Sequence, residues 1–536
     1  MIKILRTLGP IGYLAFFSPC LLGCLPEDDL SELEIKAPSP SVALPLLNTN
    51  LTVSDIVTID EEDGLLTEND DHTYGVLYRS RVASAPASSF MPEIPRQSGT
   101  QSFTLGINSP AFMKSPTQKF KGKMKLDMAG LTVFVLESKQ GTMDLRLTSE
   151  YRHDLDIKLT FPSIKSRITG NSLEWNVTVN AWSNGAVSRQ DELADYIIEL
   201  NDSEIGYELE VAIRGSGQSI SDLQRIRLDM VMEDIEFGYL SGNFTGLAIP
   251  VPADTLQIPL LANAVDGSLG LNPTLRFRFI NSFGVKVASD LSNCFVVQDD
   301  KNIQLTDKPD HSFFSGGYQL PFKQQRDDSV GIQDHIVDEY SSNIKVAFAQ
   351  LPRSFRYGLG FTLNSASEDT SFLTDQSQIG VETQIDLPLE GTFDLILEDS
   401  IPVNFQDLED VEELKVLIKT ENSFPLTANL RVYFLDENGQ LIVNSAQQPI
   451  SVFGEDQLLV AAELINSNTG KTSPATVDLP MAATLDRDKF EQVRSATHLL
   501  VRTTLNSISD ANNQIKLYSF YNVRFSLAMQ MKTSLN

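Results

Sequence analysis

The stretch Leu155-Asp156-Ile157-Lys158-Leu159-Thr160-Phe161 places an apolar side chain at every second position, with polar or charged side chains between them. Residues two apart in a β-strand point to the same face of a sheet, so such a strand buries one face and exposes the other to water. Antiparallel sheets accept this one-sided burial, whereas parallel sheets are usually buried on both faces. The stretch therefore predicts an antiparallel sheet with one solvated face.

The same alternation recurs along the chain, at residues 207–213, 275–279, 355–363 and 523–531. Patterns that favour helices are few. Residues 190–200 and 332–351 are the two candidates, the second ended by Pro352. We therefore predict a mainly β protein, built from antiparallel β-sandwich or curled-sheet domains in series with a few short helices.

An internal repeat supports a serial arrangement. Residues 274–284 and 414–425 each contain an alternating strand that runs into Asn-Ser-Phe, followed by Gly284 or Pro425. Asn and Ser favour turns because their side chains bond nearby backbone groups. We expect a duplicated β-domain, and at 536 residues the chain exceeds a single core. The expected parts are an N-terminal β region (46–250), a middle β domain (251–390) and a C-terminal β domain (391–536).

The N-terminus has the features of an export signal. Lys3 and Arg6 precede a short uncharged, mostly apolar run that ends in Leu21-Leu22-Gly23-Cys24. These four residues resemble the lipobox of bacterial lipoproteins, although the position of Leu22 usually holds a small or β-branched residue. The resemblance implies that residues 1–23 are a signal peptide and that Cys24 carries fatty acyl chains such as palmitate. Residues 24–45, acidic and then rich in Pro and Ser, would form a tether.

The chain also resembles large, uncharacterised surface or outer-membrane lipoproteins of Gram-negative bacteria. This resemblance rests on the lipobox and on residues 43–48 and 272–284. It implies a lipid-anchored protein of the outer membrane or cell surface, and it implies no activity. Separately, the acidic residues 27–29 resemble the surface-export signal of lipoproteins in some Gram-negative bacteria, with a plain polar tether as the alternative.

Composition limits the classes of partner. With 42 Lys and Arg against 71 Asp and Glu, the net charge is −29. Nucleic-acid binding requires clustered basic side chains, so nucleic acid is excluded as a partner, and so is electrostatic attraction to anionic lipid headgroups. Once Cys20 leaves with the signal peptide and Cys24 is acylated, Cys294 remains. We expect it to be a buried strand residue that behaves as a small hydrophobe.

The acidic residues Asp60, Asp63, Asp70 and Asp71 are a candidate cation site. An EF-hand register fails there because its first ligand would be Ile59, which has no side-chain oxygen. The alternative is a solvated turn. We expect no metal centre and no cofactor, since the five histidines show no HxH or HExxH spacing.

Other motifs are weak. Gly470-Lys471-Thr472 lacks the earlier glycine of a phosphate-binding loop, and the chain has no GxSxG sequence. Three Asp-Ser/Thr-apolar triplets, at 254–256, 328–330 and 399–401, resemble acceptor sites of some bacterial O-glycosylation systems.

These observations support a membrane-anchored envelope lipoprotein with a non-enzymatic binding or structural role. Its partner would be an envelope protein, a carbohydrate or a lipid. Two alternatives stay open: a carrier of lipid or another apolar ligand, and an extracytoplasmic hydrolase acting on polysaccharide.

Overall fold

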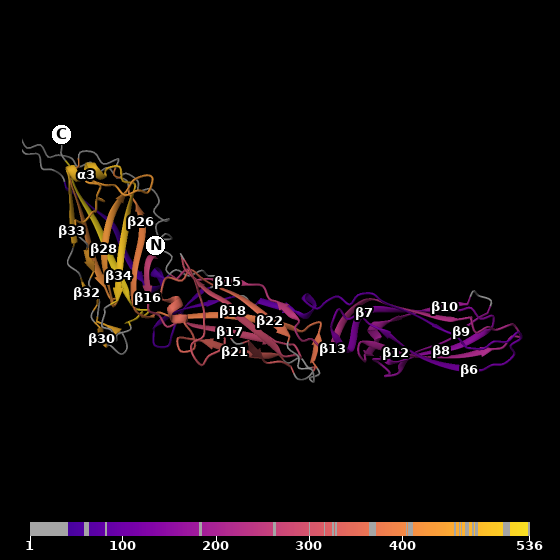
Figure 1. Cartoon of the computed structure of the whole chain (residues 1–536). Helices are drawn as coiled ribbons and strands as arrows, with labels where there is room; N and C mark the ends of the chain where they lie inside the picture. Colours follow the sequence, from indigo (N-terminus) through magenta and orange to yellow (C-terminus); the bar gives the residue numbers. More distant parts are fainter. Residues whose placement is uncertain are drawn as a thin grey trace, which may run out of the picture.

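The computed structural model describes most of residues 41–533. The segments outside the description are 1–40, 58–63, 81–82, 182–184, 261–263, 300, 316, 324–325, 327–329, 364–370, 404, 406–410, 455–456, 460, 463, 467–470, 474–475, 478–480, 508–514 and 534–536. Three β-sandwiches follow one another, the terminal one set at an angle to the line of the other two, and we call them the outer, central and terminal sandwiches (Figure 1). Every strand pair in the described part is antiparallel, which confirms the predicted fold class.

The outer sandwich uses one continuous stretch of chain. Its strands are β5 (Gln97–Phe103), β6 (Thr117–Lys125), β7 (Thr132–Ser149), β8 (Asp154–Ser166), β9 (Ser172–Val179), β10 (Ala186–Glu192), β11 (Tyr196–Glu199), β12 (Glu204–Arg214) and β13 (Ile226–Asn243). Strands β5, β13, β7 and β10 form one layer, and β9, β8, β12 and β6 form the other. Strand β11 pairs with both β7 and β8 and so joins the layers.

The central sandwich combines two separate parts of the chain. Its strands are β2 (Gly64–Glu68), β3 (Tyr74–Arg79), β4 (Ala83–Pro86), β14 (Ala248–Pro250), β15 (Asp254–Gln257), β17 (Thr274–Asn281), β18 (Val287–Val297), β19 (Asn302–Gln304), β20 (Tyr318–Leu320), β21 (Gly331–Val337), β22 (Ser354–Leu363), β23 (Ser371–Thr374) and β24 (Gln378–Pro388). Phe277 and Phe279 of β17 pack against Phe355 and Phe361 of β22, with ring centroids 6.3–6.4 Å apart. Because β17 and β22 belong to different sheets, these rings fill the space between the layers.

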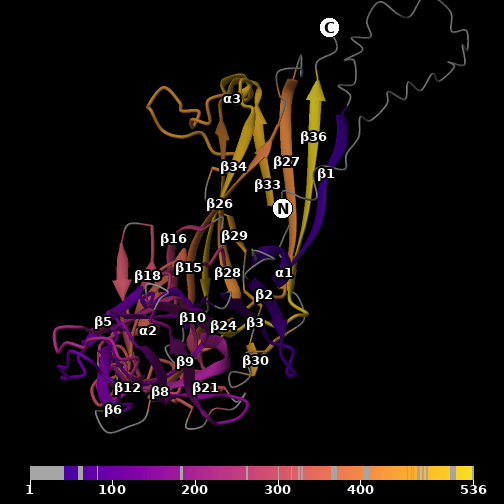
Figure 2. The same cartoon turned by 90° about the vertical axis from the view of Figure 1, so that its right-hand side faces the viewer.

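The terminal sandwich pairs the two ends of the described chain. Its strands are β1 (Ser41–Thr52), β16 (Ala264–Leu269), β26 (Phe393–Pro402), β27 (Val411–Asn422), β28 (Leu426–Leu435), β29 (Gln457–Leu459), β32 (Thr476–Val477), β33 (Met481–Asp486), β34 (His498–Ser507) and β36 (Asn522–Thr533). Two small pairs, β25 (Glu390–Gly391) with β35 (Ile515–Lys516) and β30 (Leu464–Asn466) with β31 (Lys471–Thr472), complete the set. Figure 2 shows β1 and β36 side by side along one edge.

The central and terminal sandwiches share one topology. In the first sheet of each, the order β3–β24–β17–β21 matches β1–β36–β27–β33. In the second, the order β15–β22–β18–β19 matches β26–β34–β28–β29. A short helix, α2 (Ile344–Phe348) or α3 (Arg487–Val493), precedes the equivalent strands β22 and β34. These matches support the duplicated β-domain expected from the sequence.

The repeated Asn-Ser-Phe turns are equivalent in atomic detail. The Oδ1 atom of Asn281 accepts the backbone N–H of Phe283 at 3.0 Å, and that of Asn422 accepts the N–H of Phe424 at 2.9 Å. The hydroxyl of Ser282 donates to the carbonyl of Gln378, at the start of β24. Ser423 makes the same contact with Asn522, at the start of β36. Each turn therefore ties a strand end to its neighbour.

Strand pairs cross both of the expected domain boundaries. Strand β23 pairs with β13 across residue 250, and β16 pairs with β26 across residue 390. The pairing of β1 with β36 closes the longest loop of all. The sheets therefore combine segments that are distant in sequence. The domain boundaries at residues 250 and 390 stay predictions.

The expected helices are largely wrong. Residues 190–200 form parts of β10 and β11 joined by a 3-10 turn, η3 (Leu193–Asp195), because Ile197 and Ile198 pair with β7 and β8. In residues 332–351, β21 occupies 332–337 through its pairing with β17, and only α2 is helical. Tertiary pairing overrides the local helical pattern in both segments. The other helices are α1 (Val53–Ile56) and the 3-10 turn η2 (Ala87–Ser89).

The outer and central sandwiches are joined by the long ribbon of β7 and β13. At this joint the Arg326 guanidinium makes two hydrogen bonds, of 2.7 and 3.1 Å, with the carboxylate of Glu137, which is buried on β7. The guanidinium also lies 4.3 Å above the ring of Tyr239 on β13. An ion pair between Lys139 and Asp375 lies at the same joint. Charge-assisted and cation–π contacts thus connect the two sandwiches.

Candidate functional site

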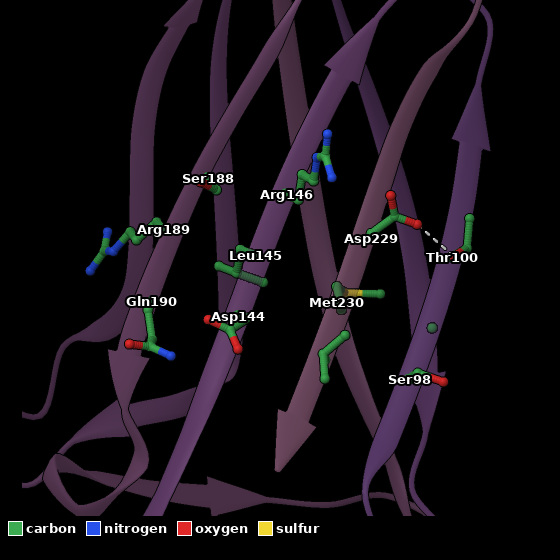
Figure 3. A pocket seen from close by; sticks show the side chains of 12 residues that line it. Ser98, Thr100, Asp144, Leu145, Arg146, Ser188, Arg189, Gln190, Asp229 and Met230 are labelled. Carbon is green, nitrogen blue, oxygen red and sulfur yellow. Dashed lines mark hydrogen bonds between the residues drawn. The ribbon is translucent and has the colours of Figure 1, made fainter.

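The outer sandwich carries a groove of about 590 Å³ on the exposed face of β5, β13, β7 and β10 (Figure 3). The strand registers arrange its side chains in two rows that run across the strands. One row contains Thr100, Asp229, Arg146 and Ser188, and the next contains Ser98, Val231, Asp144 and Gln190.

Strand alternation explains why these side chains reach the groove. On β7, Met143, Leu145 and Leu147 are fully buried, so Asp144 and Arg146 between them must face outward. On β13, the buried residues Leu228, Met230 and Met232 direct Asp229 and Val231 outward in the same way. The buried residues of each strand therefore determine which of its side chains face the groove.

The Oδ1 atom of the Asp229 carboxylate already has two partners. It accepts a 2.6 Å hydrogen bond from the hydroxyl of Thr100 and a 2.8 Å bond from the guanidinium of Arg227. Partial burial alone would raise the pKa of Asp229, but these two bonds and the nearby charge of Arg146 hold it below its usual range. Both bonds end on Oδ1, so Asp229 is an ionised acceptor at one side of the groove with one of its two carboxylate oxygens engaged.

Asp144 and Arg146 differ from Asp229 in this respect. Neither side chain makes a hydrogen bond or an ion pair with any residue that the structure describes, and the same is true of Ser98, Ser188 and Gln190. Asp144 is half-buried and Arg146 is exposed. The middle of the groove thus holds a carboxylate, a guanidinium, two hydroxyls and an amide that are free to contact a ligand.

On the opposite outer face of the same sandwich, charged side chains form ion pairs between neighbouring strands. There Lys119 contacts Glu210 at 2.9 Å, and Lys121 contacts Glu208 at 2.6 Å, each across the pair β6–β12. Lys158 on β8 similarly contacts Glu174 on β9 at 3.0 Å. The charges on that face neutralise one another, so the groove is the face with unused polar groups.

Of the residues singled out by sequence, Leu21, Leu22, Gly23 and Cys24 lie outside the described residues, as do Asp60 and Asp63. Asp70 and Asp71 lie in the turn between β2 and β3. The carboxylate of Asp71 accepts bonds from the backbone N–H and the hydroxyl of Thr73, at 3.1 and 2.6 Å, and these bonds lower its pKa. Asp71 thus stabilises a turn. No group of three or more potential metal ligands occurs among the residues that the structure covers.

Cys294 lies on β18 and is fully buried, as expected. Burial raises the pKa of its thiol to about 12, so the reactive thiolate is scarce at neutral pH. This cysteine therefore contributes packing.

A second pocket, of about 250 Å³, lies in the central sandwich beside His335 and Phe313. The ring of His335 stacks on that of Phe313 at 3.6 Å. The carboxylate of Asp307 accepts the backbone N–H groups of Phe313, Phe314 and Ser315. The polar groups of this pocket hold its own loop together, which leaves the groove of the outer sandwich as the better candidate site.

Sequence reasoning did not find the groove residues. Asp144 and Arg146 look like ordinary outward-facing positions, in the same way as Lys158. The distinguishing property is the absence of a cross-strand partner, which depends on three strand registers. A single sequence carries no signal for those registers.

No known protein family and no curated protein matches the sequence. Among solved structures, a protein presumed to be secreted, from Parabacteroides distasonis, matches over 92% of this chain and 100% of its own, at 10% identity and a TM-score of 0.27. TmCBM61 in complex with β-1,4-galactotriose matches over 36% of this chain and 88% of its own, at 10% identity and a TM-score of 0.14. These similarities are too low to assign a ligand or an activity.

Proposed function

We propose that this protein is a lipid-anchored envelope lipoprotein with a non-enzymatic binding role, which presents the groove of the outer sandwich away from the membrane. The observation that carries the proposal is the position of β1. Its first residue, Ser41, pairs with Lys532 near the end of β36, and its last, Thr52, pairs with Asn522 at the start of β36. The Asn522 end adjoins the central sandwich, since Ser519 and Tyr518 contact His72 and Thr73 there.

Strand β1 therefore begins at the free end of the terminal sandwich, the end farthest from the outer sandwich (Figures 1 and 2). Sixteen residues separate Cys24 from Ser41, and at ~3.4 Å per residue they reach at most about 55 Å. A lipid on Cys24 would hold the terminal sandwich close to the membrane. The groove would then lie at the opposite end of the molecule (Figure 1). No helix in the described part of the chain is long and apolar enough to cross a membrane.

The chemistry of the groove supports binding rather than hydrolysis. A glycoside hydrolase needs a carboxylic acid whose pKa is raised so that it can donate a proton. The pKa of Asp229, one of the two carboxylates that line the groove, is lowered instead. Burial raises the pKa of Asp386, but this residue lies on β24 of the central sandwich. The rings of the central sandwich contact one another, which gives no specific support to a carrier of apolar ligands.

The test has two parts. Replacing Cys24 with Ser should move the protein from the membrane fraction to the soluble fraction and leave it unprocessed by lipoprotein maturation. A Cys24→Ser variant that stays membrane-bound and is processed like the parent would overturn the anchor.

Orientation can be measured by energy transfer to a dye in the bilayer. Asn438→Cys places a label at the free end of the terminal sandwich, and Leu223→Cys places one at the far end of the outer sandwich, where Leu223 is 81% exposed. The buried Cys294 should stay unlabelled. We expect strong transfer from position 438 and weak transfer from position 223. Equal transfer, or the reverse order, would contradict the proposed orientation.

A further inference from the structure

We infer that the groove of the outer sandwich binds an uncharged glycan, which is held by hydrogen bonds to Asp144 and Arg146. This inference rests on the binding role proposed above and names the class of ligand. It starts from the contrast between the two outer faces of the sandwich. One face pairs its charges across strands, and the other leaves the carboxylate of Asp144 and the guanidinium of Arg146 without a hydrogen bond or an ion pair to any described residue, although the charge of Arg146 acts on Asp229 across the strands.

The two free groups have complementary hydrogen-bonding capacity. An ionised carboxylate only accepts hydrogen bonds, and a guanidinium only donates them. Asp144 and Arg146 are two positions apart on β7, about 7 Å at the usual rise of a strand. A sugar carries hydroxyl groups that both donate and accept. Adjacent hydroxyls can therefore donate to Asp144 while neighbouring hydroxyl or ring oxygens accept from Arg146.

The lining around this pair fits the same class of ligand. The hydroxyls of Ser98 and Ser188 and the amide of Gln190 each add groups that can donate and accept. A ligand with a single net charge is disfavoured. A cation attracted by Asp144 would be repelled by Arg146, and an anion attracted by Arg146 would be repelled by Asp144. An uncharged molecule rich in hydroxyls avoids both conflicts.

The groove does not suit a protein or a lipid. Energetic hot spots of protein interfaces are enriched in Trp, Tyr and Arg, with aromatic anchors at the centre of the contact. Arg146 is exposed and does not fill a desolvated pocket. Among the described residues that line the groove, Val231 is the outward-facing apolar side chain and none carries an aromatic ring. An apolar ligand would likewise leave Asp144 and Arg146 desolvated and unpaired, at considerable cost.

The size of the groove suggests a short oligosaccharide. Its volume of about 590 Å³ lies within the roughly 300–1,000 Å³ range of small-molecule sites. It also extends across four strands, which span about 14 Å at ~4.8 Å per strand spacing. Without a stacking ring, each site should bind weakly, and many copies on one membrane would strengthen attachment to a polymer.

The test uses the full mature chain in detergent micelles and a panel of neutral trisaccharides: cellotriose, maltotriose, β-1,4-galactotriose and β-1,4-mannotriose. Binding is measured by saturation-transfer NMR and titration calorimetry. We expect at least one trisaccharide to bind. Asp144→Asn and Arg146→Gln should each weaken that binding at least tenfold and leave the thermal unfolding midpoint unchanged. Glu208→Gln, at a paired charge on the opposite face, is the matched control and should bind like the parent.

Several results would overturn the inference. They are no binding of any neutral trisaccharide at 10 mM, equal binding by the parent and the Asp144 and Arg146 variants, or a groove-dependent preference for a peptide or a charged polysaccharide. The energy-transfer experiment is independent of these results. If the orientation is confirmed and glycan binding fails, the ligand class is wrong and the anchored binding role survives. If glycan binding is confirmed and the orientation fails, the ligand class survives and the proposed orientation is wrong.

Discussion

Two buried asparagines, Asn281 and Asn422, hold equivalent turns in the central and terminal sandwiches. Besides the bond from Phe283, Asn281 donates from Nδ2 to the carbonyl of Pro321 at 2.7 Å. Asn281→Ala removes both bonds and leaves buried backbone groups unsatisfied, which costs about 2–3 kcal/mol of stability. Urea denaturation followed by circular dichroism should show this loss, and Asn422→Ala should show a similar one.

Asn438 provides the control for these variants. It lies in the exposed turn after β28, where Gly439 has a φ of +74°, so Asn438→Ala should change stability by less than about 0.5 kcal/mol. A loss for Asn281→Ala as small as that of Asn438→Ala would show that the Asn-Ser-Phe turns do not hold the strand ends.

His335 should make stability depend on pH. Burial lowers the pKa of His335 in the folded protein; nearby His311 lowers it further, and Asp307 opposes both. The unfolded chain, with a pKa near ~6.5, takes up a proton at a higher pH than the folded chain does. The contribution of His335 to stability is therefore fully present above the unfolded-state pKa of ~6.5. It is lost as the pH falls from there through the lower pKa of the folded state.

We expect the urea midpoint of the parent to fall between pH 7.5 and pH 5.0, and the fall to be smaller for His335→Gln. Some dependence should remain, because burial also lowers the pKa of His153. An identical fall in both proteins would show that His335 takes up its proton equally in the folded and unfolded states.

At the scale of elements, the strands could be predicted and their partners could not. The alternating stretches at 155–161, 275–279 and 355–363 all lie within strands, β8, β17 and β22. A strand with one buried face can be recognised from its own residues, because apolar and polar side chains alternate along it. The pairing of β1 with β36 depends on contacts between residues nearly 500 positions apart, which no local pattern records.

Irregular registers are a further feature that the pattern hides. The ribbon of β7 and β13 bulges between Glu233 and Tyr239, opposite Gly141, which has a φ of +134°. A Cβ at Gly141 would lie 3.1–3.3 Å from backbone atoms of residues 233–235. The ribbon needs this glycine to bend between the outer and central sandwiches.

Gly141→Ala should therefore destabilise the protein by about 1–3 kcal/mol, through strain at the bulge. Gly206→Ala on β12 is the control, since its Cβ would meet nothing within 4 Å and its φ is not positive. Differential scanning calorimetry should show a lowered midpoint for the first variant and little change for the second. Equal midpoints would mean that the bulge relaxes without strain.

For the whole molecule, the sequence predicts a mainly β chain and a lipid anchor at Cys24, but not which end of the molecule a lipid there would hold. The candidate site shows the same division. Asp144 is recognisable as an outward-facing residue, but only the registers of β5, β13, β7 and β10 place it beside Val231 and Gln190. The proposed orientation and the groove both depend on long-range pairing. Rigid presentation of the groove then depends on the joints between the sandwiches.

The joint at Glu137 is the place to test that rigidity. Glu137 is 8% exposed, and its carboxylate holds Arg326 in two bonds and lies 3.7 Å from Arg167. Glu137→Gln removes the negative charge that both arginines face, so the outer sandwich should move more freely relative to the central one. Spin labels at Leu223→Cys and Asn438→Cys should report a broader distance distribution by pulsed electron spectroscopy. Glu208→Gln, far from the joint, should leave the distribution as narrow as in the parent. A Glu137→Gln distribution equally narrow would place the rigidity in the β7–β13 ribbon itself.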